Sequence, residues 1–181
     1  MPAVEHTFLD HVPEHIYIDT DVFISYLIGT QPHHVRCRAF LERLKREART
    51  TLYVSSLSWL EIAHVITRSG FRDDLAADLR HQYRLSRWQR PEIRRTYIDG
   101  LIGDFETALG QFPWVEVPIT PMVRRLAVRF MAAYGLGSQD ATHLASAAQA
   151  RVAHFASLDA GYRCVDDLDL WNDLIHGASS A

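Results

Sequence analysis

Cysteine is scarce in this sequence. Its two cysteines, Cys37 and Cys164, lie far apart among 181 residues and form no CxxC or Cys/His ligand spacing. Disulfide frameworks and zinc sites both need several such residues at characteristic spacings. Neither kind of site is indicated, and both thiols are expected to be reduced and buried.

The sequence also lacks long apolar runs. None approaches the roughly 20 residues that cross a bilayer. The first residues, MPAVEHTFLDHVPEH, show no basic region followed by an apolar one, so they do not resemble a secretory signal. With 48% hydrophobic and 23% charged residues, the chain is expected to form one folded domain over residues 1–181. We expect a cytoplasmic protein with no membrane association.

Lysine is nearly absent, since Lys45 is the only one, and the formal net charge is −3. The chain as a whole therefore does not attract nucleic acid, whose binding depends on neutralised phosphates. Almost all positive charge is carried by arginine, which can donate two parallel hydrogen bonds to a phosphate. Any contact with RNA would be local.

Strand-like and helix-like patterns alternate along the chain. Strands are predicted at 16–18, 51–56, 114–119 and 154–159, with an edge strand at 164–171. Helices are predicted at 22–27, 32–48, 57–70, 121–134 and 139–150, and two more between 73 and 110 with a break near Pro91. Pro32 suits a first helical turn, and Thr120 and Ser138 suit N-caps. This alternation predicts an α/β fold with a mainly parallel sheet between helical layers.

Four acidic residues stand where such a sheet would bring them together. Asp19 and Asp159 end two of the predicted strands, and Glu61 and Asp140 fall in the first turns of neighbouring helices. In parallel sheets, sites lie at the carboxyl ends of the strands. Each acid alone has an ordinary explanation as a cap, turn former or surface charge. The inference of a site depends on their convergence.

Converging carboxylates repel one another unless a cation neutralises them. Oxygen ligands without a histidine or thiolate cluster favour Mg²⁺ or Mn²⁺ over Zn²⁺. Such a centre can activate water for hydrolysis of a phosphodiester bond. The acidic pattern therefore predicts a metal-dependent phosphodiesterase.

Four segments in order, IYIDTDVF, SSLSWLEIAHVI, LGSQDATHLASAAQA and FASLD, resemble the four motif blocks of the PIN-domain family, especially the VapC-like toxins of toxin–antitoxin pairs. WVEVPITPMVRRLAVRFMAAYG resembles the strand and helix before the third block. The resemblance covers most of residues 15–70 and 114–167. It implies a PIN-like three-layer α/β/α sandwich and a ribonuclease that uses Mg²⁺ or Mn²⁺.

The resemblance assigns roles by position. The metal ligands and catalytic residues it implies are Asp19, Glu61, Asp140 and Asp159. Ser157 matches a frequent Ser or Thr, whereas Asp21 stands where the family often has Asn or Ser. Thr20, Asp21 and Ser157 are candidates to support the ligands. The implied partners are an RNA substrate, transfer or ribosomal RNA, together with an antitoxin and a second copy of the chain.

The region of residues 71–112 and the first fourteen residues do not match the family and are interpreted as elaborations, the former helical. A basic segment with interleaved Tyr83 and Trp88 lies here; its cations are Arg80, Arg84, Arg87, Arg90, Arg94 and Arg95. Such a helical face can hold phosphates and stack bases. Arg80, Arg84 and Arg87 are the RNA-binding candidates, and a solvated surface or a site for an acidic peptide is the alternative.

Other readings of the same residues stay open. A haloacid-dehalogenase-type phosphatase would use Asp19 of IYIDTDVF as nucleophile, but it needs a later cationic residue, usually lysine, and Lys45 comes too early. A non-catalytic PIN-type scaffold that binds RNA or protein has no reason to keep four repelling acids. His64 and His143 follow acids by three residues, as in di-iron helix bundles. Because these blocks alternate with strands, both are predicted to be packed or supporting histidines.

Overall fold

The computed structural model describes residues 1–47, 49–64 and 91–172. One parallel sheet runs through the molecule in the order β1-β6-β5-β2-β3-β4, and all five strand pairs are parallel. The strands are β1 (Val4–His6), β2 (His15–Ile18), β3 (Thr51–Ser55), β4 (Trp114–Val117), β5 (His154–Ala156) and β6 (Asp169–Trp171). The predicted parallel α/β fold is confirmed.

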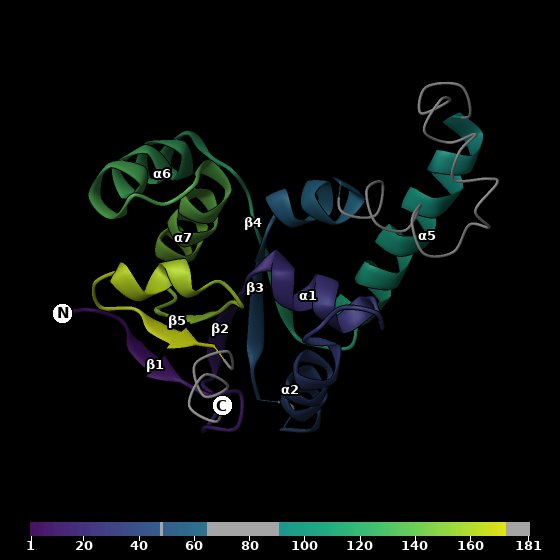
Figure 1. The fold of residues 1–181 in the computed structure, drawn as a ribbon, viewed down its shortest axis with the longest axis horizontal. Helices are drawn as coiled ribbons and strands as arrows, with labels where there is room; N and C mark the ends of the chain where they lie inside the picture. Colours follow the sequence, from purple (N-terminus) through teal and green to yellow (C-terminus); the bar gives the residue numbers. More distant parts are fainter. Residues whose placement is uncertain (48, 65–90, 173–181) are drawn as a thin grey trace.

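Helices connect the strands and cover both faces of the sheet (Figure 1). They are α1 (Thr20–Leu27), α2 (His34–Glu47), a helical segment at 57–64, α5 (Pro91–Leu109), α6 (Pro121–Tyr134) and α7 (Ser138–Ala150), with a short 3-10 helix at Ala160–Cys164. α5 begins at Pro91, the residue predicted to break the helical region. Among the described residues, no helix is long and apolar enough to cross a membrane.

The two faces of the sheet follow from the alternation of side chains along each strand. Ile16, Ile18 and Leu52 belong to a buried cluster with side chains of α1, α2 and α5. Tyr17 and Phe155 point the other way, into a second cluster that contains Leu144 and Ala147 of α7. The sheet is therefore the middle layer of an α/β/α sandwich.

Several local predictions are confirmed and others are wrong. Thr120 caps α6 by accepting from the Val123 amide, with Pro121 next to it in the first turn. Ser138 is not a cap but the first residue of α7, whose N-cap is Gly137. α2 starts two residues after Pro32. Cys37 is buried as expected, whereas Cys164 is exposed.

The edge of the sheet differs most from the prediction. β6 spans only Asp169–Trp171, and it is not the edge strand because β1 pairs with its outer side. β1 lies in the N-terminal segment, for which no strand was predicted. Three-residue strands bury too few side chains to produce a recognisable period of two. The predicted end of a helix near residue 70 lies outside the described residues.

Candidate active site

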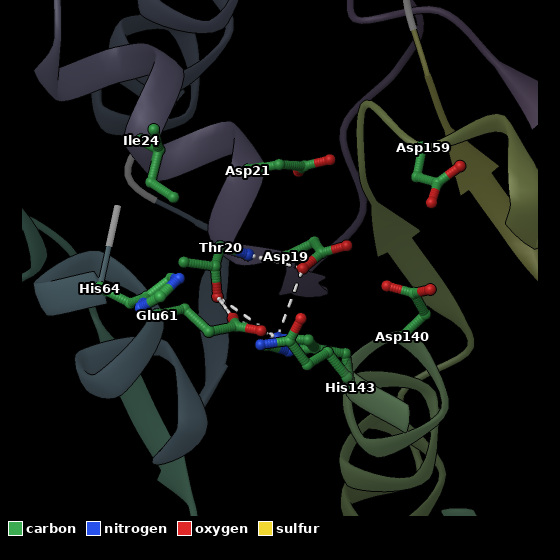
Figure 2. A pocket seen from close by; sticks show the side chains of 10 residues that line it. Asp19, Thr20, Asp21, Ile24, Glu61, His64, Asp140, His143 and Asp159 are labelled. Atoms are coloured by element: carbon green, nitrogen blue, oxygen red, sulfur yellow. Dashed lines mark hydrogen bonds and ion pairs between the residues drawn. The ribbon is translucent and has the colours of Figure 1, made fainter. Parts of the chain in front are cut away.

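The four predicted acids line one pocket at the carboxyl ends of β2 and β5 (Figure 2). Asp19 directly follows β2, and Asp159 lies three residues after β5. Glu61 comes from the helical segment 57–64, and Asp140 from the first turn of α7. The sheet topology thus brings together residues from across the sequence, and Thr20, Asp21, His64 and His143 join them in the lining.

Asp19 is the best-anchored of these acids. It is only 6% exposed. Its Oδ1 accepts from the Thr20 amide at 2.7 Å, as the N-cap of α1, and its Oδ2 accepts from the Ser157 hydroxyl at 2.9 Å. Because both of its oxygens accept hydrogen bonds, the Asp19 carboxylate is held in one orientation. Ser157 therefore stands where the sequence placed it, as a support for Asp19.

Glu61 is held by a buried polar network. Its Oε2 lies 2.7 Å from His143 Nε2 and accepts from the Thr20 hydroxyl at 2.5 Å. His143 is 1% exposed, and its Nδ1 lies 2.8 Å from the Tyr17 hydroxyl. His143 is thus a packed histidine beside an acid, as predicted. Tyr17 was not predicted, because an aromatic residue in a buried strand gives no sign of a polar contact.

The charges of this network are coupled. Burial lowers the pKa of His143, but Asp19 and Glu61 more than compensate and raise it from 6.5 to about 9. Burial raises the pKa of Glu61, but the hydrogen bond and charge of His143 and the Thr20 hydroxyl outweigh it, so that its pKa is lowered. At neutral pH the pair is an imidazolium and a carboxylate, with Nδ1–H donating to Tyr17 and Nε2–H to Glu61.

Two other acids of the cleft, Asp21 and Asp140, have raised pKa values. Burial, followed by the charges of Asp159 and Asp19, raises the pKa of Asp140. Burial, followed by the charge of Asp19, raises the pKa of Asp21 well above its ordinary value. Like charges and desolvation both penalise the ionised forms. A bound cation would remove this penalty.

The residues present fit a divalent metal ion. Possible ligand atoms of Asp19, Glu61 and His143 lie within 4.8 Å of one another, and His143 can contribute its nitrogen only when the ring is neutral. Asp21 adds a buried Oδ1 without a hydrogen-bond partner in the described part of the chain. Oxygen donors dominate the pocket lining, which suits a hard cation. The arrangement can hold such an ion but does not by itself identify it.

Two glycines, Gly137 and Gly161, leave room for the carboxylates of Asp140 and Asp159, and the sequence analysis did not identify them. A Cβ on Gly137 would lie 2.9 Å from Asp140 Oδ2, and one on Gly161 would lie 3.1 Å from Asp159 Oδ1. The Gly161 amide also donates to Asp159 Oδ1 at 2.7 Å. Each glycine stands within three residues of its acid, and this spacing was the only available signal. The RNA-binding candidates Arg80, Arg84 and Arg87 lie outside the described residues.

A parallel α/β/α sandwich with an acidic cleft at the carboxyl edge of its sheet defines the class of the molecule. The family is identified by sequence: the PIN domain model matches residues 16–168, and the chain belongs to the PIN domain family. This confirms the resemblance carried by the four motif blocks. A comparison with curated proteins finds no match.

Three solved structures from bacteria share the fold of this chain. FitAcB from Neisseria gonorrhoeae is 19% identical, with a TM-score of 0.55 over 87% of this chain and 97% of that one. VapC20 from Mycobacterium tuberculosis, a sarcin-ricin loop cleaving toxin, is 11% identical, with a TM-score of 0.54 over 81% and 92%. VapBC2 from Rickettsia felis, bound to a promoter DNA fragment, is 12% identical, with a TM-score of 0.53 over 87% and 98%. At these identities the likeness concerns the fold.

Proposed function

We propose that this chain is a metal-dependent endoribonuclease that hydrolyses RNA phosphodiester bonds and acts as the toxin of a toxin–antitoxin pair. The observation that carries the proposal is the convergence of Asp19, Glu61, Asp140 and Asp159 from four separate elements on one cleft. Membership of the PIN domain family supports it independently.

The four acids would hold Mg²⁺ or Mn²⁺. When bound, the ion supplies acidification of a water molecule and neutralisation of phosphate charge. Asp19 would be the central ligand, and the Thr20 amide and the Ser157 hydroxyl hold its carboxylate in place. The His143 imidazolium and the Thr20 hydroxyl hold Glu61 in one rotamer. Asp140 and Asp159 close the opposite side of the cleft (Figure 2). Without a cation, this lining would repel a phosphodiester.

The substrate in this proposal is a transfer or ribosomal RNA. VapC20, a sarcin-ricin loop cleaving toxin, is a precedent within the same fold. Arg80, Arg84 and Arg87 are the residues proposed to bind phosphates, on the strength of their spacing and interleaved aromatics in the sequence. Contact at that segment would be local, because the net charge of −3 gives no general attraction.

The proposal includes two protein partners, an antitoxin that blocks the cleft and a second copy of the chain, in the cytoplasm. The fold shared with the VapC20 toxin, and the resemblance of the motif blocks to VapC-like toxins, support the first. Exposed apolar side chains on α6 support a protein interface, namely Met122, Val128 and Met131. The match to the PIN domain family over residues 16–168 argues against the haloacid-dehalogenase-type phosphatase. A non-catalytic scaffold remains the competing function.

The decisive experiment is cleavage of total RNA by the purified, partner-free chain with Mg²⁺ or Mn²⁺, beside an EDTA control. Asp140→Asn keeps the shape of the side chain but removes a ligand charge, and we expect it to reduce cleavage by about 100-fold or more. Asp104→Asn on the exposed surface of α5 is the matched control and should cleave normally. Light scattering of the same sample measures the dimer.

Cleavage that survives EDTA would contradict the metal-dependent mechanism. Cleavage that is equal in the wild type and Asp140→Asn would remove the acidic cleft from the reaction. No cleavage by folded wild type with either metal would favour the non-catalytic scaffold.

A further inference from the structure

Asp21 is a fifth acid in the cleft, and the four assigned ligands do not account for it. It lies in the first turn of α1, two residues after Asp19, and lines the same pocket. In Figure 2 its carboxylate points across the cleft toward Asp159, on the side of Asp19 away from Glu61 and His143. Asp21 therefore lies beside Asp159, on the side of the cleft where the described acids form no ion pair.

The two oxygens of Asp21 differ in their partners. Oδ2 accepts from the Leu158 amide at 2.9 Å and lies 3.1 Å from the Ser157 hydroxyl. That hydroxyl also lies 2.9 Å from Asp19 Oδ2, so one hydrogen is shared by two carboxylates. Oδ1 is buried and accepts no hydrogen bond of ordinary geometry from the residues described here; the adjacent Val22 amide lowers the pKa of Asp21 but donates to the Asp19 carbonyl at 3.3 Å. Such a buried acceptor costs free energy unless it finds a partner.

Charge separates the cleft into two halves. On one side, the His143 ring lies 2.7 Å from Glu61 and 3.6 Å from Asp19. On the other side, Asp21, Asp140 and Asp159 make no ion pair with a cationic side chain in the part of the chain that the structure describes. A cation on the Asp21 side would therefore face carboxylates that have no such close ion pair.

A purely structural role explains only part of this arrangement. An acid in a first helical turn interacts well with the helix dipole, and Oδ2 links α1 to the loop after β5. An asparagine would accept from the Leu158 amide equally well, without placing a second negative charge beside Asp19. The carboxylate and its unpartnered Oδ1 need a different explanation.

We propose that Asp21 is a direct ligand of the divalent cation, through Oδ1, in addition to the four acids already assigned. The inference rests on the proposed function for the presence of a cation but concerns a residue that this function does not require. It extends the ligand set along α1, from Asp19 to Asp21.

The first test is calorimetric titration of Mn²⁺ into the full-length wild type, Asp21→Asn and the matched control Asp104→Asn. Asp21→Asn keeps the side-chain shape and should weaken Mn²⁺ binding about tenfold or more, whereas Asp104→Asn should bind like the wild type. Thermal unfolding in EDTA verifies folding. There, Asp21→Asn should be at least as stable as the wild type, because a repelling buried charge is removed.

The second test separates direct ligation from a long-range charge effect. The luminescence lifetimes of bound Eu³⁺ in H₂O and D₂O count the water molecules on a hard cation. Asp21→Ala should gain at least one bound water where the carboxylate was, and Asp104→Ala should gain none.

Each outcome decides the proposal. Weaker Mn²⁺ binding by Asp21→Asn together with an added water in Asp21→Ala supports direct ligation. Unchanged affinity, or an unchanged number of waters, overturns the assignment of Asp21 but leaves the proposed nuclease intact. Absence of Mn²⁺ binding by the wild type overturns both, and this separates the two kinds of failure.

Discussion

Asp19 and Glu61 raise the pKa of His143, which lines the cleft, from 6.5 to about 9. Its buried imidazolium joins the partly exposed Glu61 to Tyr17. A buried charge of this kind is tolerated only because a carboxylate faces it. The stability of the metal-free protein should therefore depend on pH.

The pH dependence has a definite sign. The pKa of His143 rises from 6.5 to about 9 on folding, so the folded state binds the proton more tightly. This stabilisation is complete below pH 6.5 and is lost as the pH rises to about 9. We expect a loss on the order of 3 kcal/mol in the free energy of unfolding. Denaturant unfolding in EDTA across this range measures it.

His143→Gln is the control for this titration, since the raised pKa values of Asp21 and Asp140 also favour lower pH. The variant should show a distinctly smaller loss between pH 6.5 and 9. Equal pH profiles for the two proteins would mean that His143 is not the group that titrates.

Gly137 offers a separate prediction about ligand position. In Gly137→Ala the new methyl group would lie 2.9 Å from Asp140 Oδ2 and push the carboxylate aside. Alanine is a poorer N-cap than glycine but restricts the unfolded chain, so stability should change by no more than about 1 kcal/mol. RNA cleavage should fall about tenfold, because displacement by an ångström disturbs a metal centre.

Gly103→Ala is the matched control for Gly137→Ala. A Cβ on Gly103 meets no atom within 4 Å, and the residue lies in α5, away from the cleft. It should cleave RNA like the wild type. Full activity of Gly137→Ala would show that the Asp140 carboxylate tolerates displacement.

At the level of elements, the sequence predicted what local patterns encode. β2, β3, α6 and α7 have apolar periods and clear boundaries, such as the Thr120–Pro121 cap. The acids at the ends of β2 and β5 could be located because a parallel sheet brings its carboxyl ends together. The convergence of the cleft therefore follows from topology and spacing alone.

Elements fixed by tertiary contacts were predicted less well. β1 and β6 have three residues each, and their pairing depends on each other. In α2, Val35 is 78% exposed, whereas Cys37, Phe40 and Leu41 are buried. Which face of a short amphipathic helix packs depends on the neighbouring helix, here α1. Tyr17 shows the same limit, since its polar contact exists only once α7 is in place.

On the scale of the whole molecule, α5, which belongs to the described part of the helical elaboration, is part of the common core. Phe105 of α5 is 0% exposed and packs edge-on against Phe23 of α1 and Trp59, with ring centroids 5.1 Å apart in both pairs. Trp59 lies two residues before Glu61, in the same helical segment. α5 therefore supports one wall of the acidic cleft, although it lies outside the motif blocks.

This packing predicts one cooperative unfolding transition for the chain. Phe105→Ala removes a buried ring between two helices and should cost about 3–5 kcal/mol. If residues 1–181 form one domain, as the sequence predicts, the entire transition should move to lower temperature, by calorimetry and by circular dichroism alike. Asp104→Ala, the exposed neighbour on α5, should change stability by less than about 0.5 kcal/mol. Two transitions, of which only one shifts in Phe105→Ala, would instead mean that the elaboration folds as a separate unit and that the cleft does not depend on it.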